Sequence, residues 1–193
     1  MNHKDPNQKS GRKQTLHQDI PKNQLRMIVY SSLFVALIAM GAFIAIPIGP
    51  VPIVLQNMFV LLAGIILGPV WGLACVGIYL LIGFAGLPVF AGATSGVGKL
   101  FGPTGGYLLA YLPAVFVTGA ISKAFKKNIP GNVIAMVAGS LIVYAIGVPW
   151  LKLAFSLPWN KALVLGMYPF LIGDGLKITA AVFIAKKIQP LLR

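Results

Sequence analysis

Long runs of apolar residues, separated by short segments rich in glycine and proline, dominate the chain and predict membrane-spanning helices. A helix that crosses a bilayer needs about 20 mostly apolar residues. The runs and their boundaries predict helices over residues 25–46, 53–67, 70–85, 107–125, 133–150 and 165–188. The pattern therefore predicts an all-α integral membrane protein, a bundle of about six transmembrane helices.

The second and third of these helices are short for membrane spans. The segment GPVWG, residues 68–72, joins them and is too tight to hold a loop. We expect the two helices to form a hairpin of marginal length, or to tilt less than their neighbours.

Composition supports a membrane protein without a separate soluble domain. Hydrophobic residues make up 58% of the 193 residues and charged residues only 10%, against about 25% charged residues in an average soluble domain. We predict a disordered polar cytoplasmic tail over residues 1–25, with His3 and His17 solvated, and a single membrane domain over residues 26–193. The tail is too polar for a signal peptide.

The formal net charge of +13 does not indicate nucleic acid binding. The basic residues cluster at the ends of apolar runs and are not interleaved with aromatic residues on a soluble face. Cys75 is the only cysteine, which excludes an internal disulfide and a cysteine-based metal cluster. We expect no nucleic acid partner, no metal and no cofactor.

The basic residues instead predict how the chain is oriented in a bacterial cell membrane. With the tail in the cytoplasm, the inner side holds Lys4, Lys9, Arg12, Lys13, Lys22, Arg26, Lys123, Lys126, Lys127, Lys186, Lys187 and Arg193. The outer connections hold only Lys99, Lys152 and Lys161. This asymmetry follows the positive-inside rule and predicts that both termini are cytoplasmic.

The predicted outer connections are rich in glycine and proline and poor in charge, unlike ordinary solvated loops. Non-helical backbone near membrane depth is tolerated only where protein buries it or where it lines a cavity. The first two connections, IPIGPVP and the loop beginning at Gly86, are therefore expected to fold back over the bundle and to cover a pocket.

Asp174 is the only acidic residue of the apolar part, and Lys177 follows it three residues later. This spacing places both side chains on one helix face, where they can pair or converge on a ligand. A charge at the bilayer centre costs at least about 2.5–3.5 kcal/mol on insertion scales, so such residues face a cavity or a partner. The alternative is a structural ion pair between helices. The position of Asp174, about two helical turns below the predicted outer end of its helix, favours a ligand pocket reached from outside.

Two further segments carry candidate ligand groups. Gln56 and Asn57 begin a predicted helix after the first outer connection, where an amide can donate and accept hydrogen bonds or act as a helix contact or cap. The loop over residues 86–107 offers backbone N–H groups, glycines and polar or aromatic side chains. Its candidate ligand-binding residues are Phe90, Gly92, Thr94, Ser95 and Tyr107.

The same loop contains ATSGVGKL, which departs from a phosphate-binding P-loop at Ala93 and Leu100. The chain also lacks a paired general acid and base, so the sequence does not predict an enzyme. On the first helix, small residues such as Ser32, Ala36, Gly41 and Ala45 permit close approach of another helix. They either dock a partner or pack the bundle itself.

The segments IPIGPVPIVLQN, GLPVFAGATSGVG, GPTGGY and PFLIGDGLK, in this order, resemble the BioY family, the biotin-specific substrate-binding components of energy-coupling factor (ECF) transporters. The resemblance covers nearly the whole chain after residue 25. It implies a six-helix membrane protein that captures biotin from outside and works with a transmembrane coupling subunit and two ATP-binding-cassette ATPases. It also implies ligand contacts by Asp174, Lys177, Gln56 and the loop over residues 86–107.

Substrate-binding components of this kind are described as docking through an alanine-x-x-x-alanine surface on the first helix. Here the nearest forms are Ser32 with Ala36 and Gly41 with Ala45.

Two other functions compete with biotin capture. A pocket for another small vitamin would use the same groups. A secondary transporter would couple uptake to protons through Asp174, although the sequence shows no evident inverted repeat of the kind found in many such transporters.

Overall fold

The structure is a computed structural model that describes residues 21–47 and 49–192. Its helices and strands, in chain order, are α1 (Lys22–Phe43), β1 (Ala45–Ile46), β2 (Ile53–Val54), α2 (Gln56–Leu67), α3 (Pro69–Phe84), α4 (Gly98–Phe101), α5 (Gly105–Ala124), α6 (Ile129–Ala154), α7 (Trp159–Gly166) and α8 (Tyr168–Ile188), followed by the 3₁₀ helix η2 (Gln189–Leu192).

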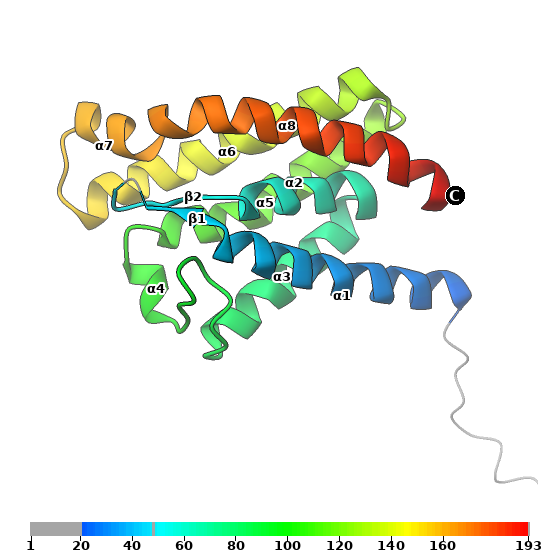
Figure 1. Cartoon of the computed structure of the whole chain (residues 1–193), viewed down its shortest axis with the longest axis horizontal. Coiled ribbons are helices and arrows are strands. Elements are labelled where there is room, and N and C mark those ends of the chain that lie inside the picture. Colours follow the sequence, from blue (N-terminus) through cyan, green and yellow to red (C-terminus); the bar gives the residue numbers. More distant parts are fainter. Residues whose placement is uncertain (1–20, 48, 193) are drawn as a thin grey trace, which may run out of the picture.

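The long helices form a bundle around α5, which packs against α2, α3 and α6. Helix α1 packs against α2 and α3, and α8 packs against α2 and α6. The β1–β2 hairpin, α4 and α7 lie at one end of the bundle (Figure 1). The start of α1 and the C-terminus lie at the opposite end.

Four segments of the described chain are long and apolar enough to span a membrane: α1, α5, α6 and the α7–α8 segment Trp159–Ile188. Helices α2 and α3 have 12 and 16 residues, which corresponds to about 18 and 24 Å. Gly68, at a φ of 85°, makes the sharp turn between them, and Pro69 opens α3 where no N–H is needed. The expected short hairpin of helices is therefore present.

The first predicted helix, over residues 25–46, has the length of α1 but is shifted by three residues toward the C-terminus. Helix α1 begins at Lys22 and ends at Phe43, and Ala45–Ile46 pairs with Ile53–Val54 in the antiparallel hairpin of β1 and β2. Pro47 disfavours helical geometry at the preceding Ile46, which explains why the helix does not continue. Residues 22–25 of the predicted disordered tail therefore belong to α1, and residues 1–20 lie outside the described residues.

The last predicted helix, over residues 165–188, corresponds to α8 and overlaps only the last two residues of α7, so α7 was not predicted as a helix. Met167, with φ −135° and ψ −57°, separates α7 from α8, and Pro169 follows in the first turn of α8, where its missing N–H costs no hydrogen bond. Helix α6 extends beyond its predicted span at both ends, to Ile129 and Ala154. The single-turn helix α4 was not predicted.

Helices α5 and α6 approach closely because small and polar residues line their contact. A Cβ at Gly147 of α6 would clash with the ring of Tyr107 on α5, so only glycine fits there. Ser122 donates a hydrogen bond to Asn132 Oδ1 at 2.6 Å, and Thr118 donates to the carbonyl of Ala135 at 3.2 Å. These bonds satisfy hydroxyls within the apolar bundle.

The small residues of α1 have different environments. Ser32 and Ala36 are exposed on the helix surface. Gly41 is buried, and a Cβ there would lie 2.7 Å from Phe59 Cδ2 of α2, so its size serves packing inside the chain. Ala45 belongs to β1. A docking surface on α1 stays a prediction, and only Ser32 and Ala36 of this set are placed to reach a partner.

The basic residues separate along the bundle as the orientation rule requires. The end that holds the C-terminus and the start of α1 carries the α5–α6 turn and the last turn of α8, with Lys22, Arg26, Lys123, Lys126, Lys127, Lys186 and Lys187. The opposite end carries Lys99, Lys152 and Lys161.

Candidate functional site

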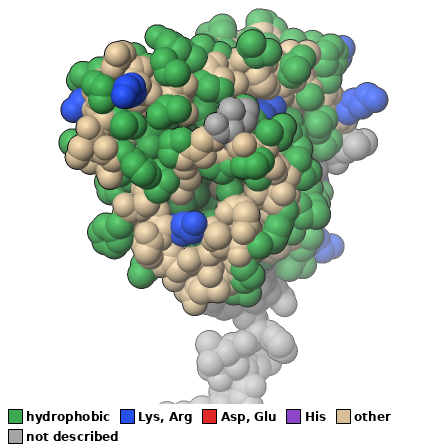
Figure 2. All heavy atoms as spheres, turned by 60° about the vertical axis from the view of Figure 1, so that its left-hand side comes forward, with side chains coloured by type: hydrophobic (Ala, Val, Ile, Leu, Met, Phe, Trp, Pro, Cys, Tyr) green, Lys and Arg blue, Asp and Glu red, His purple; other side chains and the backbone are tan. Residues whose placement is uncertain are grey.

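A cavity of about 490 Å³ lies beneath the β1–β2 hairpin and the loop that contains α4. Side chains of α2, α5, α6 and α8 form its floor and walls, and the hairpin contributes several prolines. Figure 2 shows this end of the molecule as mostly hydrophobic side chains and backbone, hollowed near the middle, with no acidic side chain in view. The two connections that were predicted to fold over the bundle thus cover a cavity.

Asp174 and Lys177 both line this cavity from α8. Lys177 Nζ donates to Asp174 Oδ1 at 3.2 Å, and the two side chains are only 11% (Lys177) and 8% (Asp174) exposed. The second carboxylate oxygen, Oδ2, accepts a hydrogen bond from the Tyr144 hydroxyl of α6. The carboxylate is therefore paired on both oxygens, which stabilises a buried charge and holds it in one orientation.

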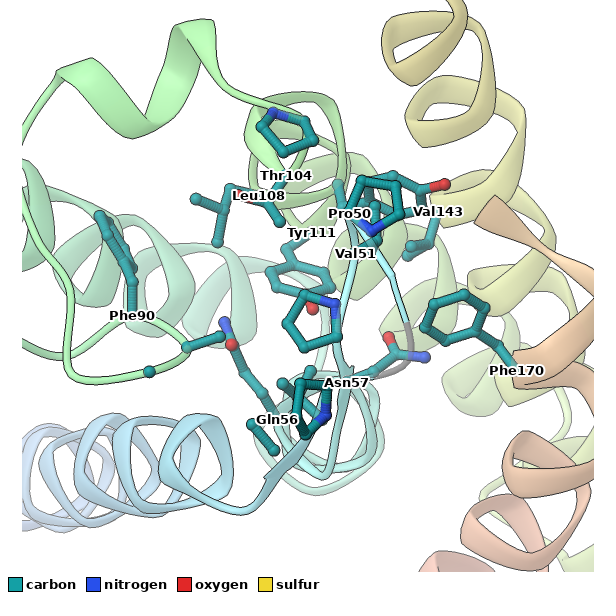
Figure 3. A pocket seen from close by; sticks show the side chains of 18 of the residues that line it. Pro50, Val51, Gln56, Asn57, Phe90, Thr104, Leu108, Tyr111, Val143 and Phe170 are labelled. Carbon is teal, nitrogen blue, oxygen red and sulfur yellow. The ribbon is translucent and has the colours of Figure 1, made fainter. Parts of the chain in front are cut away.

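Tyr144 and Tyr111 are site residues that the sequence did not single out. Both are buried and line the cavity, Tyr144 from α6 and Tyr111 from α5. Figure 3 shows the Tyr111 ring in the middle of the pocket. A buried tyrosine usually finds a partner for its hydroxyl, but a tyrosine in an apolar run packs as readily as it binds, so the sequence carried no signal for either residue.

Gln56 and Asn57 enter the cavity from the first turn of α2. Gln56 is 2% exposed, and its Nε2 has no hydrogen-bond partner within the described residues; the same holds for Asn57 Oδ1. Figure 3 shows the two amides on either side of Tyr111. A buried donor or acceptor without a partner costs about 1–3 kcal/mol, so these amides are groups that a polar ligand would satisfy.

The loop above the cavity is closed by a pair of backbone hydrogen bonds between Phe90 and Thr94. Gly92 lines the cavity and adopts a φ of 72°, which a glycine accommodates without strain. Thr94 also lines the cavity, but its hydroxyl donates to the carbonyl of Ala91 at 2.9 Å. Ser95 is not among the residues that line the cavity. The loop therefore offers mainly backbone groups to a ligand.

Phe90 and Tyr107 line the cavity but are also held by the fold. Phe90 packs edge-on against Tyr79, with ring centroids 5.7 Å apart, and Tyr79 donates to the carbonyl of Val89 at 2.9 Å. The Tyr107 hydroxyl donates to the carbonyl of Gly166 at 2.8 Å and so ties α5 to the end of α7. Both present apolar ring surface to the pocket, and the donor of Tyr107 is already used.

The cavity thus combines apolar walls with a few polar groups and two cations. Lys99, from α4, lies in the roof, and Lys177 lies near Asp174. Asp174 is the only acidic side chain in residues 21–192, and no group of three or more metal-binding side chains occurs among the described residues. The arrangement suits a small organic ligand with hydrogen-bonding groups at one end and an anionic group at the other.

The comparisons with known proteins agree with one another. The chain matches the BioY family over residues 12–193. It is 42% identical to the probable biotin transporter BioY of Pyrococcus horikoshii, over 82% of this chain and 93% of that protein. It is 39% identical to the biotin transporter BioY of Thermotoga maritima, over 86% of this chain and 98% of that protein.

A solved structure has the same fold. The crystal structure of the S-component for biotin from an ECF-type ABC transporter superposes with a TM-score of 0.83 at 34% identity. The match covers 89% of this chain and 95% of that one.

Proposed function

The chain belongs to the BioY family, and we propose that it captures biotin at the outer face of a cell membrane as the substrate-binding component of an ECF transporter. It acts as a transport component and not as an enzyme. The observation that carries this function is the covered cavity built around Asp174, in a chain that matches the biotin S-component over nearly its full length.

The polar floor of the cavity suits the ureido ring of biotin. That ring has two N–H donors and one carbonyl acceptor. Asp174 and Asn57 Oδ1 accept from the N–H groups, while Gln56 Nε2, Tyr111 or Lys177 donates to the carbonyl. The hydrogen bond that the Asp174 carboxylate accepts contributes most, because hydrogen bonds to a charged group are about twice as strong as neutral ones.

The carboxylate tail of biotin needs a donor near the mouth of the pocket. Lys99 supplies a cation in the roof, and Thr104 supplies a hydroxyl in the cavity lining. Apolar side chains contact the sulfur ring and the methylene chain, and they include Leu108, Val143 and Phe170. Four residues of the predicted set, Phe90, Gly92, Thr94 and Tyr107, contribute shape and backbone groups. Ser95 has no support from the cavity lining.

Transport requires partners that bind the loaded component. We propose a transmembrane coupling subunit and two ATP-binding-cassette ATPases in the cytoplasmic membrane of a bacterial cell. The similarity of this chain to an S-component from an ECF-type ABC transporter supports this assembly. Ser32 and Ala36, exposed on α1, are the residues of the predicted docking set that remain available to the coupling subunit.

Calorimetric titration of biotin into the detergent-purified chain, without any partner, tests the capture function. We expect saturable binding of one biotin per chain. Desthiobiotin and an unrelated vitamin serve as comparisons, and competition by unlabelled vitamins tests whether the pocket takes a different one. A folded protein that releases no heat with biotin would refute the proposal.

Asp174→Asn tests the site itself. Removing the charged acceptor should weaken biotin binding about ten- to hundredfold, the range for a hydrogen bond to a charged group. Because the single change leaves Lys177 without its anionic partner, the double variant Asp174→Asn, Lys177→Gln provides a neutral pair of similar size. Full biotin affinity in both folded variants would exclude Asp174 from the site.

A further inference from the structure

At the end of the bundle opposite the cavity, we propose a binding site for the phosphate headgroup of an anionic phospholipid. A hollow of about 370 Å³ opens there between the start of α1, the end of α2, the α5–α6 turn and the start of η2. Its lining residues are Asn23, Arg26, Met27, Tyr30, Ile66, Leu67, Lys127 and Gln189. None of them lines the ligand cavity.

Cations from separate segments converge on this hollow. Lys127 Nζ donates to the carbonyl of Ile66 at 3.1 Å, in the last turn of α2, and so lies in the wall of the hollow. Arg26 lies over the Tyr30 ring, 5.9 Å from its centroid, which positions the guanidinium beside the same hollow. Lys127 also borders a neighbouring hollow that contains Lys186. Three basic side chains thus line two neighbouring hollows, which share Lys127 and Gln189.

The turn that carries Lys127 adopts an unfavourable conformation. Lys126 and Lys127 have φ values of 53° and 57°, in the left-handed region that non-glycine residues rarely adopt. The N–H of Lys127 donates to the carbonyl of Ser122 at 2.8 Å, which holds the turn. This geometry directs Lys127 toward α2, while Lys126 stays exposed and lines neither hollow.

A neutral donor adds to the cations. Gln189 lines both hollows, and its Nε2 is buried without a hydrogen-bond partner within the described residues. A phosphate oxygen would satisfy this donor. Guanidinium, ammonium and amide N–H groups are the donors that recognise phosphate.

A membrane lipid fits better than a free phosphate ion because the hollow has an apolar side. Met27, Ile66 and Leu67 line it together with the basic groups. The adjoining stripe of α1 exposes Leu25, Val29 and Leu33, which are available to acyl chains. Basic pockets between membrane helices on the cytoplasmic side bind anionic headgroups. A zwitterionic lipid would bring its own cation toward the basic side chains of the hollow.

The test is a titration of the full-length protein with short-chain phosphatidylglycerol in a neutral detergent. The shift of the protein's thermal unfolding midpoint measures binding. Short-chain phosphatidylcholine and inorganic phosphate form parallel arms. We expect saturable stabilisation by phosphatidylglycerol, with an apparent affinity about fivefold tighter than for phosphatidylcholine, and no saturable effect of inorganic phosphate. Equal effects of the two lipids, or of phosphatidylglycerol and inorganic phosphate, would overturn the proposal.

Matched variants localise the effect. Arg26→Gln and Lys127→Gln should each weaken the phosphatidylglycerol effect about fivefold. Lys126→Gln, the same change at the adjacent residue, should leave it unchanged. An equal loss in the Lys126 variant would indicate diffuse attraction of charge and contradict a site.

If Arg26→Gln instead weakens assembly with the coupling subunit and leaves lipid binding intact, the hollow belongs to a protein interface and the proposal fails. The Arg26→Gln variant is also titrated with biotin, so that a failure of the lipid site can be distinguished from a failure of the capture function.

Discussion

At the residue scale, the environment of Asp174 makes ligand affinity depend on Tyr144. The Tyr144 hydroxyl donates to Oδ2 of the carboxylate, while Lys177 holds Oδ1. We expect Tyr144→Phe to weaken biotin binding about tenfold or more, because a hydrogen bond to a charged group contributes about 1.5–3 kcal/mol and the carboxylate would lose its orientation. Calorimetric titration of the variant measures the change.

Tyr168→Phe is the matched control for this experiment. Tyr168 also loses a hydroxyl, but it is exposed at the start of α8 and does not line the cavity. Its biotin affinity should equal that of the unaltered protein. Unchanged affinity in the Tyr144 variant would show that Lys177 alone is enough to hold Asp174 in position.

Some site residues stand out in the sequence and others do not, for a physical reason. A single carboxylate in an apolar chain is conspicuous because a buried charge must have a partner or a cavity, so Asp174 could be found directly. Tyr111 and Tyr144 could not, since a tyrosine in an apolar helix packs as readily as it binds. The sequence made the Thr94 hydroxyl a candidate ligand group, but the fold uses it within the chain, as it also uses the hydroxyl of Tyr107.

At the scale of elements, close packing of α5 and α6 shapes one wall of the cavity. We expect Gly147→Ala to lower the unfolding midpoint, because overpacking of a tight contact costs about 1–3 kcal/mol. It should also weaken biotin binding, since the clash displaces Tyr107, which lines the cavity. Thermal unfolding and titration of the same sample measure both effects.

Gly77→Ala in α3 is the control for that substitution. Nothing lies within 4 Å of a Cβ at Gly77, so alanine should leave stability unchanged or raise it by about 0.5–1 kcal/mol, with no effect on biotin. Equal stability and affinity in the two variants would mean that α6 moves away from α5 without cost.

The elements were predicted well where hydrophobic length decides them and poorly where loops begin. The apolar runs located α2, α3 and α5 to within a few residues. The β1–β2 hairpin, α4 and the break at Met167 lie where Gly and Pro permit several backbone paths. Contacts with the rest of the bundle select among those paths, and the local sequence does not.

At the scale of the whole molecule, the separation of charge along the bundle predicts its orientation. In a Cys75→Ala background, a cysteine in place of exposed Lys161 should react with a membrane-impermeant maleimide in intact cells. A cysteine in place of exposed Lys126 should react only after the cells are permeabilised, because the positive-inside rule predicts that this end faces the cytoplasm. Cys75 is the only cysteine of the chain, so its replacement leaves the introduced cysteine as the only thiol that a maleimide can label.

The reverse labelling pattern would place the cavity on the cytoplasmic side and contradict capture from outside. Labelling of both positions in intact cells would indicate leaky membranes or a mixed population. A permeable maleimide, which should label both positions in every sample, controls for reactivity.

The sequence by itself determined that the protein is a helical membrane protein, which end carries the positive charge, and that Asp174 and Lys177 share one helix face in an apolar surrounding. These properties follow from the length of apolar runs, which is a local feature of the sequence, and from the large free-energy cost of placing a charge in a bilayer. Only the tertiary structure decided that Tyr144 holds Asp174, that Gln56 and Asn57 keep unpaired groups at the cavity, and that Lys127 rather than Lys126 lines the basic hollow. Those outcomes depend on which helices pack together and on turns of one or two residues. Sequences with the same apolar pattern can differ in these contacts and turns, so the pattern alone does not specify them.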